Sequence, residues 1–328
     1  MAKGSNHPKQ SVSVRLGLIV IAALVVATAH AADHETAKHF YSDANGLFDQ
    51  GRFAEAASEY GRAIGEDPKY VEASYNRALA NEMVDRAQAI KDWQQFLDAA
   101  GERPEYKWDV ARIRARIQIL KAKPPLPEAM QPGRYATAAG DYYREIAQAS
   151  EGEQWSKLPV KVYLGSAPQV KWQEGVREAY DVWSAVFPMQ LVGTPEKADI
   201  RMGWEESLDE EGQAGEESDW VRMQSVGGQL NGRTVAVITI DLSRPWSKDE
   251  MRAIILHEFG HALGIKGHSD TKKDIMYAEI QEKSRQLRAP SGAPLPVFWR
   301  SLVKDPSPRD INTLIRLYNS AGSIARFD

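Results

Sequence analysis

One run of twelve residues limits what this chain can be: residues 257–268 are His-Glu-Phe-Gly-His-Ala-Leu-Gly-Ile-Lys-Gly-His. His257 and His261 are four residues apart, so a helix presents both imidazoles on one face and toward a single ion. Glu258 follows the first histidine and points beside the ion, where its carboxylate can act as a general base on water. The run therefore predicts a helical metal site with catalytic chemistry.

The distribution of histidine supports this interpretation. The chain has seven histidines, of which four lie at or before residue 39 and three lie within the twelve-residue run. Histidines kept for general polarity or packing would be scattered. A bare His-Glu-x-x-His also occurs by chance in unrelated helices, and the clustering argues against that alternative. Because the chain has no cysteine, the site has no thiolate ligand and the fold has no disulfide bond.

The predicted site needs a third ligand, because catalytic zinc takes three protein ligands and leaves a fourth position for water. His268 is the candidate, and Asp270 or Asp274 is the alternative oxygen ligand. His268 cannot lie on the same face of a continuing helix, so the chain must turn after His261. Gly264 can make this turn, because glycine adopts positive φ without the steric cost of a Cβ atom.

The helix that carries the motif has a predicted start and lies in a predicted α+β domain. Ser247 is its expected N-cap, and Glu250 completes a capping box. Before it, apolar residues alternate as in strands or follow helical spacing. Residues 160–164 and 200–204 alternate, residues 172–187 have helical spacing, and residues 235–240 are apolar on both faces. This order of strands and helices is typical of an α+β domain.

These residues together resemble the metzincin family of zinc peptidases, close to its matrixin-like branch. That family has the pattern His-Glu-x-x-His-x-x-Gly-x-x-His, followed by a methionine turn. Here the first eight positions match, and residues 274–277, Asp-Ile-Met-Tyr, are similar to the methionine turn. One extra residue puts Gly267 where the third histidine would be, and His268 follows it; archaemetzincins have the same longer spacing. The resemblance extends over about residues 155–320.

The resemblance implies a zincin-like fold, with a mixed twisted sheet, an active-site helix and a closing helix that opens at residues 307–311. It also implies a zinc-dependent endopeptidase with Glu258 as general base and Met276 packed under the ligands without binding the ion. The zinc ligands that it implies are His257, His261 and His268. Matrixins often bind calcium as well, and the acidic residues between 205 and 219 are candidate calcium ligands. A plain solvated loop is the alternative for that segment.

Residues 33–121 have a helical and repetitive pattern that resembles the 34-residue tetratricopeptide repeat. Each of two copies has aromatic and small residues at helical spacing and a closing proline, and residues 106–121 form a capping helix. A generic helical bundle with the same spacing is the alternative. The positions on which the pattern rests are Phe40, Ala44, Leu47, Ala56, Tyr60, Ala63, Tyr75, Ala78, Ala89, Trp93 and Phe96.

The capping helix is basic and ends at a proline-rich segment. Residues 123–127 are Lys-Pro-Pro-Leu-Pro, which cannot continue a helix because proline lacks the amide donor. Residues 122–135 are therefore a predicted linker, and residues 136–328 a catalytic domain that folds without the repeats. We expect the basic residues to form a solvated face, with an acidic partner as the alternative. They are Arg112, Arg114, Arg116, Lys121 and Lys123.

Residues 1–32 are a predicted secretory signal peptide. Three basic residues precede an apolar run at 16–29, which has 14 residues where a spanning helix needs about 20. Small residues follow, with cleavage expected after Ala31 or Ala32. We expect an exported bacterial protein, periplasmic or secreted, with no stable membrane span. An uncleaved inner-membrane anchor is the alternative.

The leading hypothesis is a zinc endopeptidase whose helical repeats recruit a protein or peptide substrate, or a protein partner. The second is an interaction protein whose zinc domain is an inactive scaffold. Glu258 argues against it, because a purely structural site has no use for a base beside its metal. A zinc hydrolase of non-peptide amides is the third. The net charge of −4 and the pI near 6.0 give no electrostatic case for nucleic acid.

Overall fold

The chain divides into two compact units. The helical unit consists of residues 1–81, 87–110 and 326–328, and the α+β unit of residues 82–86 and 111–325. The computed structural model describes residues 33–101, 103–123, 125–150, 153–205, 221–230, 233–242, 246–277, 305–322 and 327. The predicted signal peptide and most of the acidic segment, residues 206–219, lie outside the described residues. Among these described ranges, no helix is both long enough and apolar enough to cross a membrane.

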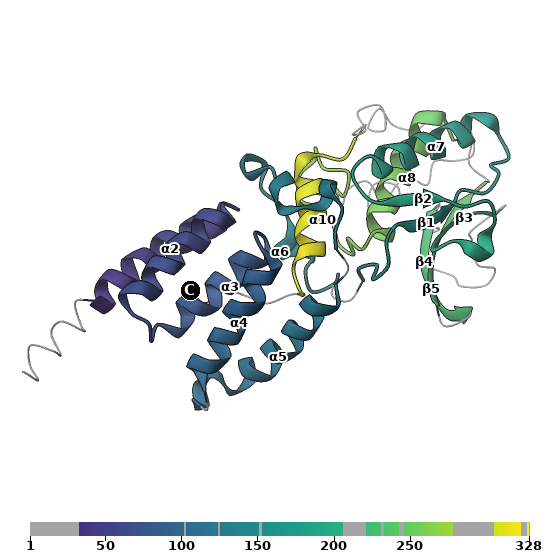
Figure 1. The fold of residues 1–328 in the computed structure, drawn as a ribbon. Coiled ribbons are helices and arrows are strands. Elements are labelled where there is room, and N and C mark those ends of the chain that lie inside the picture. Colours follow the sequence, from purple (N-terminus) through teal and green to yellow (C-terminus); the bar gives the residue numbers. More distant parts are fainter. Residues whose placement is uncertain are drawn as a thin grey trace, which may run out of the picture. The chain divides into compact units, whose positions relative to one another are not determined.

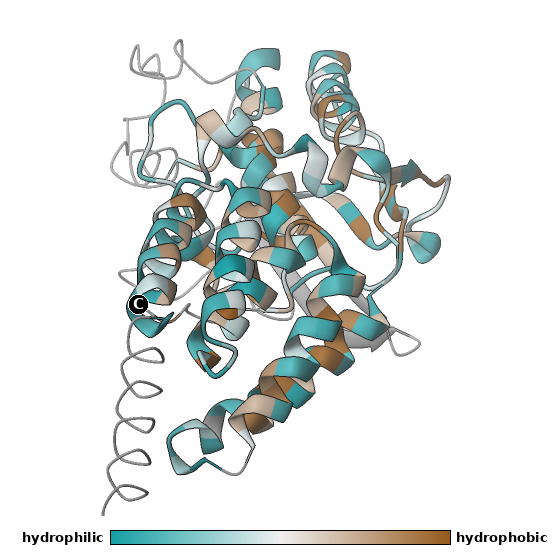
Figure 2. Cartoon of the chain, turned by 60° about the vertical axis from the view of Figure 1, so that its left-hand side comes forward, coloured by the Kyte–Doolittle hydropathy of each residue, from teal (hydrophilic) through white to brown (hydrophobic). Residues whose placement is uncertain are grey.

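The helical unit begins with a helix at residues 33–49, followed by α2 (Phe53–Glu66), α3 (Val71–Glu82) and α4 (Arg86–Ala100) (Figure 1). Hydrophobic and hydrophilic residues occupy different faces of the helices (Figure 2). Small and aromatic side chains fill the interior of the unit, as their spacing predicts. The fully buried ones include Ala44, Ala56, Tyr60, Ala63, Ala78, Ala89, Trp93 and Phe96.

The first helix buries a face next to the predicted one. The pattern predicts that Phe40, Ala44 and Leu47 are buried, whereas Tyr41, Ala44 and Phe48 are buried and Phe40 and Leu47 are half-buried. Both sets fit a period of 3.6 residues, so periodicity alone does not distinguish them. The hydroxyl of Tyr41 makes hydrogen bonds inside the unit, and this favours its inward position.

Helix α5 (Lys107–Ala122) follows a 3-10 turn at Pro104–Tyr106 and buries Ile113, Ile117 and Leu120. Arg112 and Arg114 are exposed, as a solvated face requires. Arg116 departs from that expectation, because its side chain is only 6% exposed. It makes a bidentate ion pair with Glu82, with nitrogen–oxygen distances of 2.6 and 2.7 Å. A buried guanidinium requires such a partner, since an unpaired buried charge is strongly destabilising.

The α+β unit contains a mixed five-stranded sheet in the order β2-β1-β3-β5-β4. All neighbouring strands are parallel except β4, which pairs antiparallel with β5. Helix α7 (Val170–Ser184) provides the crossover between the parallel strands β1 and β2. This arrangement confirms the α+β class that the order of strands and helices predicts, and the strand directions agree with the mixed sheet that the resemblance implies. The strands are β1 (Val160–Tyr163), β2 (Met189–Leu191), β3 (Ile200–Glu205), β4 (Val221–Leu230) and β5 (Arg233–Asp241).

Helices α7 and α8 (Lys248–Ala262) lie on the same side of this sheet (Figure 1). They meet closely at Gly175, where a Cβ atom would lie 2.7 Å from the carbonyl oxygen of Lys248. The indole of Trp172 donates to the carbonyl of Trp246 just before α8, at 2.7 Å. The indole of Trp183 donates to the carbonyl of Leu256 within α8, at 2.8 Å. Helix α7 thus fixes the helix that carries the histidine motif.

The remaining described elements of the α+β unit are short, apart from the last helix. The helix α6 (Tyr143–Ile146) follows three 3-10 turns at Glu128–Met130, Pro132–Arg134 and Thr137–Ala139, and a further 3-10 turn lies at Pro195–Lys197. The closing helix is α10 (Pro308–Asn319), which begins within the predicted residues 307–311. A capping box between Ser307 and Asp310 starts it.

Candidate metal centre

Helix α8 begins where the sequence predicts and carries three of the candidate residues near its end. Glu250 N donates to Ser247 Oγ at 3.2 Å, and Ser247 N donates to Glu250 Oε2 at 2.8 Å. This reciprocal capping box satisfies two amide groups at the start of the helix. His257, Glu258 and His261 lie in the last two turns and are all buried.

The chain turns sharply after α8, at the predicted glycine. Gly264 has a φ of 111°, a conformation that residues with a Cβ atom rarely adopt. Side chains from outside the helix satisfy its last carbonyls. Trp155 Nε1 donates to Ala262 O, and the Tyr318 hydroxyl donates to Leu263 O, both at 2.9 Å. The turn is therefore held on both sides.

Gly267 stands one residue before His268, at the end of the turn that begins at Gly264. Of these two glycines, Gly264 has positive φ and Gly267 does not. A Cβ atom at residue 267 would lie 2.6 Å from Cγ2 of Ile146 on α6. Glycine therefore lets the loop approach α6 closely, which helps to place His268.

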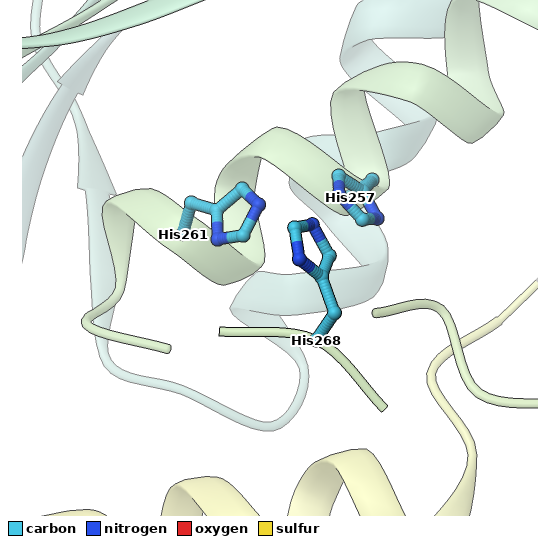
Figure 3. A group of neighbouring side chains, drawn as sticks. All are labelled: His257, His261 and His268. Atoms are coloured by element: carbon cyan, nitrogen blue, oxygen red, sulfur yellow. The ribbon is translucent and has the colours of Figure 1, made fainter. Parts of the chain in front are cut away.

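The turn brings His268 to the two histidines of α8. Figure 3 shows His257 and His261 projecting from the same helix and His268 reaching toward both from the following loop. Their potential ligand atoms all lie within 4.8 Å of one another. The ring centroids are separated by 4.8 to 5.2 Å. The three imidazoles can therefore share one metal ion, as the sequence predicts.

Backbone carbonyls orient the two histidines of α8. His257 Nδ1 lies 2.7 Å from Ile275 O, and His261 Nδ1 lies 2.6 Å from Ile265 O. Because a carbonyl only accepts, each Nδ1 carries the proton and each Nε2 keeps its lone pair. Nε2 of His257 is buried and has no hydrogen-bond partner among the described residues. A metal ion would satisfy this nitrogen, so the site fits zinc.

Burial keeps these two imidazoles neutral. It lowers the pKa of His257 to about 4, an effect that the hydrogen bond to Ile275 opposes and neighbouring His268 increases. Burial also lowers the pKa of His261 well below its ordinary value, and His257 adds to this. Neutral imidazole is the form that binds metal, so little free energy is needed to deprotonate the ligands near pH 7.

The two alternative oxygen ligands lie outside this group. Asp270 is exposed at the surface. Asp274 is buried, but its carboxylate accepts hydrogen bonds from the Ser269 hydroxyl, from the Ser307 hydroxyl at 2.6 Å and from Arg309 Nη1 at 2.9 Å. These bonds direct it toward the start of α10. His268 is therefore the side chain that completes the group of potential ligands.

Asp310 is a supporting residue that the sequence assigns only to the start of the closing helix. Its carboxylate also accepts from Ile275 N at 2.9 Å and from the Tyr142 hydroxyl at 2.6 Å. Since Ile275 O accepts from His257, Asp310 positions the carbonyl that orients a candidate ligand. The sequence places Asp310 in the first turn of the closing helix, but no local pattern predicts its contact with Ile275 over 35 residues.

Comparison with known proteins agrees with this geometry. Residues 157–291 match the family model for matrixin. These residues form a matrixin domain. The matrixin domain, with its three clustered histidines, is a zinc-dependent metalloendopeptidase domain that acts on protein or peptide substrates. The helical unit has no match to the tetratricopeptide family, so its repeats stay a prediction. A search of curated proteins finds no match to the chain.

Proposed function

We propose that the matrixin domain cleaves peptide bonds with Glu258 as the general base and with zinc held by His257, His261 and His268. The observation that carries this assignment is the buried Nε2 atom of His257, which lacks a hydrogen-bond partner among the described residues inside a group of three imidazoles. Glu258 is 4% exposed and follows His257 on the same helix. A purely structural site would not need a carboxylate there.

Each residue then has a distinct task. When bound, zinc supplies a Lewis acid that acidifies water and polarises the scissile carbonyl. Glu258 takes the proton from the attacking water and delivers it to the leaving amine. His257 and His261 stay neutral and are held by their Nδ1 protons on Ile275 O and Ile265 O. No side-chain nucleophile is required, so no acyl-enzyme forms.

Cleavage of a peptide library by the wild type and by Glu258→Ala tests this proposal. We expect the variant to keep its fold and stoichiometric zinc and to lose hydrolysis, because it lacks the base but keeps the ligands. Glu145→Ala, at an exposed position of α6, is the matched control and should cleave normally. Loss of zinc from Glu258→Ala, or near-normal turnover, would contradict the assigned role. Activity confined to non-peptide amides would favour the alternative hydrolase.

We propose further that the helical unit recruits a substrate or partner. The alternative is an interaction protein whose zinc domain is inactive, and retained peptidase activity would exclude it. A variant that lacks residues 33–81 removes most of the helical unit but keeps the Glu82–Arg116 ion pair. We expect it to cleave short peptides normally and folded protein substrates more slowly. Equal loss on both substrates would show that the helices support catalysis itself.

The division into a signal peptide at 1–32, repeats at 33–121, a linker at 122–135 and a catalytic domain at 136–328 is also a proposal. Its support is the basic and apolar N-terminal pattern and the prolines at 124, 125 and 127. N-terminal sequencing of the protein from a bacterial periplasm would test export. A mature chain that starts at Ala32 or Asp33 is the expected result, and an intact N-terminus on the membrane fraction would indicate an anchor.

A further inference from the structure

The helical unit holds a residue from the far end of the same sequence. Phe327 belongs to this unit by its contacts, although α2 to α4 precede it by more than 200 residues. Its ring lies against Tyr75, with centroids 4.5 Å apart and planes at 63°. The ring of Tyr106 lies 6.2 Å away at 83°. Such edge-on contacts are favourable pairings of aromatic rings.

The main chain of Phe327 is bound as well as its ring. Asn76 Nδ2 donates to Phe327 O at 2.7 Å, and Phe327 N donates to Asn76 Oδ1 at 2.9 Å. One side-chain amide therefore pairs with both polar groups of one residue, as a neighbouring strand would. The Tyr41 hydroxyl also donates to Phe327 O, at 2.7 Å. These three bonds recognise main chain and do not depend on the side chain of residue 327.

The side chains that bind the main chain are held in place by their own contacts. Asn76 Nδ2 lies 2.9 Å from the Tyr41 hydroxyl and 3.2 Å from Asn45 Oδ1. The Tyr60 hydroxyl donates to the same oxygen of Asn45 at 2.5 Å. Asn76 is completely buried. A prearranged network of this kind binds a peptide group without first losing side-chain entropy.

The aromatic side of the site is equally fixed. Tyr75 packs edge-on against Trp93 at 4.9 Å and against Phe96 at 5.2 Å. The Tyr106 hydroxyl donates to Glu72 Oε1 at 2.5 Å. Trp93 and Phe96 are completely buried. The ring of Phe327 therefore meets a rigid wall, which selects for an aromatic side chain.

A buried amide such as that of Asn76 is costly when its donor and acceptor lack partners. Within the helical unit, the amide oxygen of Asn76 accepts a hydrogen bond from the main-chain N–H of Phe327. The amide nitrogen of Asn76 donates to the carbonyl of Phe327. A helical bundle that bound no peptide segment would be expected to have an apolar residue at position 76. The site has instead the features of a receptor for a peptide in extended form.

We propose that the helical unit is a binding site for an extended peptide segment with an aromatic side chain, and that Phe327 is its intramolecular ligand. This inference rests on the proposed recruiting role of the helical unit and names the chemistry of what is recruited. Asn76 and Tyr41 bind the main chain, and Tyr75 and Tyr106 bind the ring. A substrate or partner segment of the same chemistry displaces Phe327.

Competition between Phe327 and a free peptide determines how much the apparent affinity of the site for that peptide is lowered. A ligand tethered by a short segment acts at an effective concentration on the order of 1 mM. If the site has an intrinsic dissociation constant of about 100 μM for such a peptide, the tethered ligand weakens binding of a free peptide about tenfold. Removal of the Phe327 ring should therefore uncover the site.

Fluorescence anisotropy with a labelled synthetic peptide of residues 320–328 tests the proposal. The protein is the full-length, zinc-loaded Glu258→Ala variant, so that the peptide is not cleaved. We expect the added change Phe327→Ala to increase peptide affinity about tenfold, because the tethered ligand no longer competes. A peptide with alanine in place of its phenylalanine should bind at least tenfold more weakly to the same protein.

Substitutions in the receptor side chains locate the binding event. In the Phe327→Ala background, Asn76→Asp should weaken peptide binding at least tenfold, because it places a carboxylate against the peptide carbonyl. Tyr41→Phe is a milder change that removes one donor, and we expect a loss of about threefold to tenfold. Circular dichroism checks that each variant is folded. If Asn76→Asp does not fold, the peptide affinity of Tyr41→Phe alone tests whether the peptide binds at this site.

Two results would overturn the inference: equal peptide affinity with and without Phe327, or binding that is insensitive to both Asn76→Asp and Tyr41→Phe. The first would mean that Phe327 does not occupy the peptide site, and the second that the peptide binds elsewhere. The recruiting role has its own test in the cleavage of protein substrates. The shortened chain could cleave proteins more slowly while the full-length protein binds no peptide at Asn76. That pair of results would refute this inference and leave the recruiting role standing.

Discussion

Met276 occupies the space that a side chain at Gly260 would need. A Cβ atom built on Gly260 would overlap Sδ of Met276 and lie 3.3 Å from its Cε. Gly260 directly precedes His261 on α8, and Met276 is completely buried in the methionine turn. The absence of a side chain at residue 260 is therefore what lets this turn pack directly beneath the candidate ligands.

Gly260→Ala should displace Met276 and loosen the site. Because α8 is held by Trp183 and cannot retreat freely, we expect a loss of about 1–3 kcal/mol in the free energy of unfolding, as for other overpacked cores. Zinc affinity should fall as well. Gly65→Ala in α2 is the control, since a Cβ atom there meets nothing within 4 Å. Urea melts and zinc titrations measure both effects, and an unchanged Gly260→Ala protein would show that Met276 adapts.

The third zinc ligand is tested by three substitutions. His268→Ala should weaken zinc binding by at least about 100-fold, since two imidazoles make a poor site. This exceeds the loss caused by removing a residue that only hydrogen-bonds to a ligand. Asp270→Ala should bind zinc normally because Asp270 is exposed. Asp274→Ala should destabilise the protein, because Ser269, Ser307 and Arg309 lose their common acceptor. Tight stoichiometric zinc in His268→Ala, with loss in an aspartate variant, would make a carboxylate the ligand.

Asp310→Asn should disturb the site from a distance. The variant keeps the shape of the side chain but turns an amide donor toward groups that themselves donate, Ile275 N and Ser307 N. We expect a loss of about 2–4 kcal/mol in stability, because these bonds are charge-assisted and buried. Zinc affinity should fall about 10–100-fold, as for other residues that hold the hydrogen-bond partner of a metal ligand in place.

Asp305→Asn is the matched control for Asp310→Asn, since the side chain of Asp305 is 68% exposed and contacts Arg252. Competition against a chelator measures zinc affinity, and urea melts measure stability. Lowered stability with unchanged zinc affinity would mean that Asp310 supports the start of α10 but does not position Ile275.

The features that the sequence predicts are those set by short spacings. The two histidines four residues apart, the capping box at Ser247 and Glu250, and the turn at Gly264 all follow from local rules. The strands at 160–163 and 200–205 follow from alternation of apolar residues. For these elements the residues that decide the structure are neighbours in the chain.

The features that the sequence does not predict depend on contacts between distant residues. Asp310 reaches Ile275 over 35 residues, and Asn76 reaches Phe327 over 251. Arg116 can be buried because its guanidinium forms an ion pair with Glu82. The choice between Tyr41 and Phe40 as the buried residue depends likewise on which neighbour each one meets. Periodicity cannot supply such pairings, because it describes one helix at a time.

The neutral histidines should make the metal-free protein sensitive to acid. Burial lowers the pKa of His257 from 6.5 to about 4, and it also lowers that of His261 well below its ordinary value. Between about pH 6.5 and 4 the unfolded chain therefore binds more protons than the folded protein. Stability must fall as the pH falls through this window, by up to about 1.4 kcal/mol per pH unit for each histidine.

Urea melts in the presence of a chelator at pH 7, 6 and 5 measure this slope. His257→Phe is the comparison, because phenylalanine fills the ring volume and does not titrate. Other groups contribute to the slope in both proteins, so the difference between them isolates His257. We expect the variant to lose less stability between pH 6 and pH 5 than the wild type, by about 1 kcal/mol. Parallel pH profiles would mean that His257 takes up its proton as readily in the folded protein as in the unfolded chain, contrary to its burial.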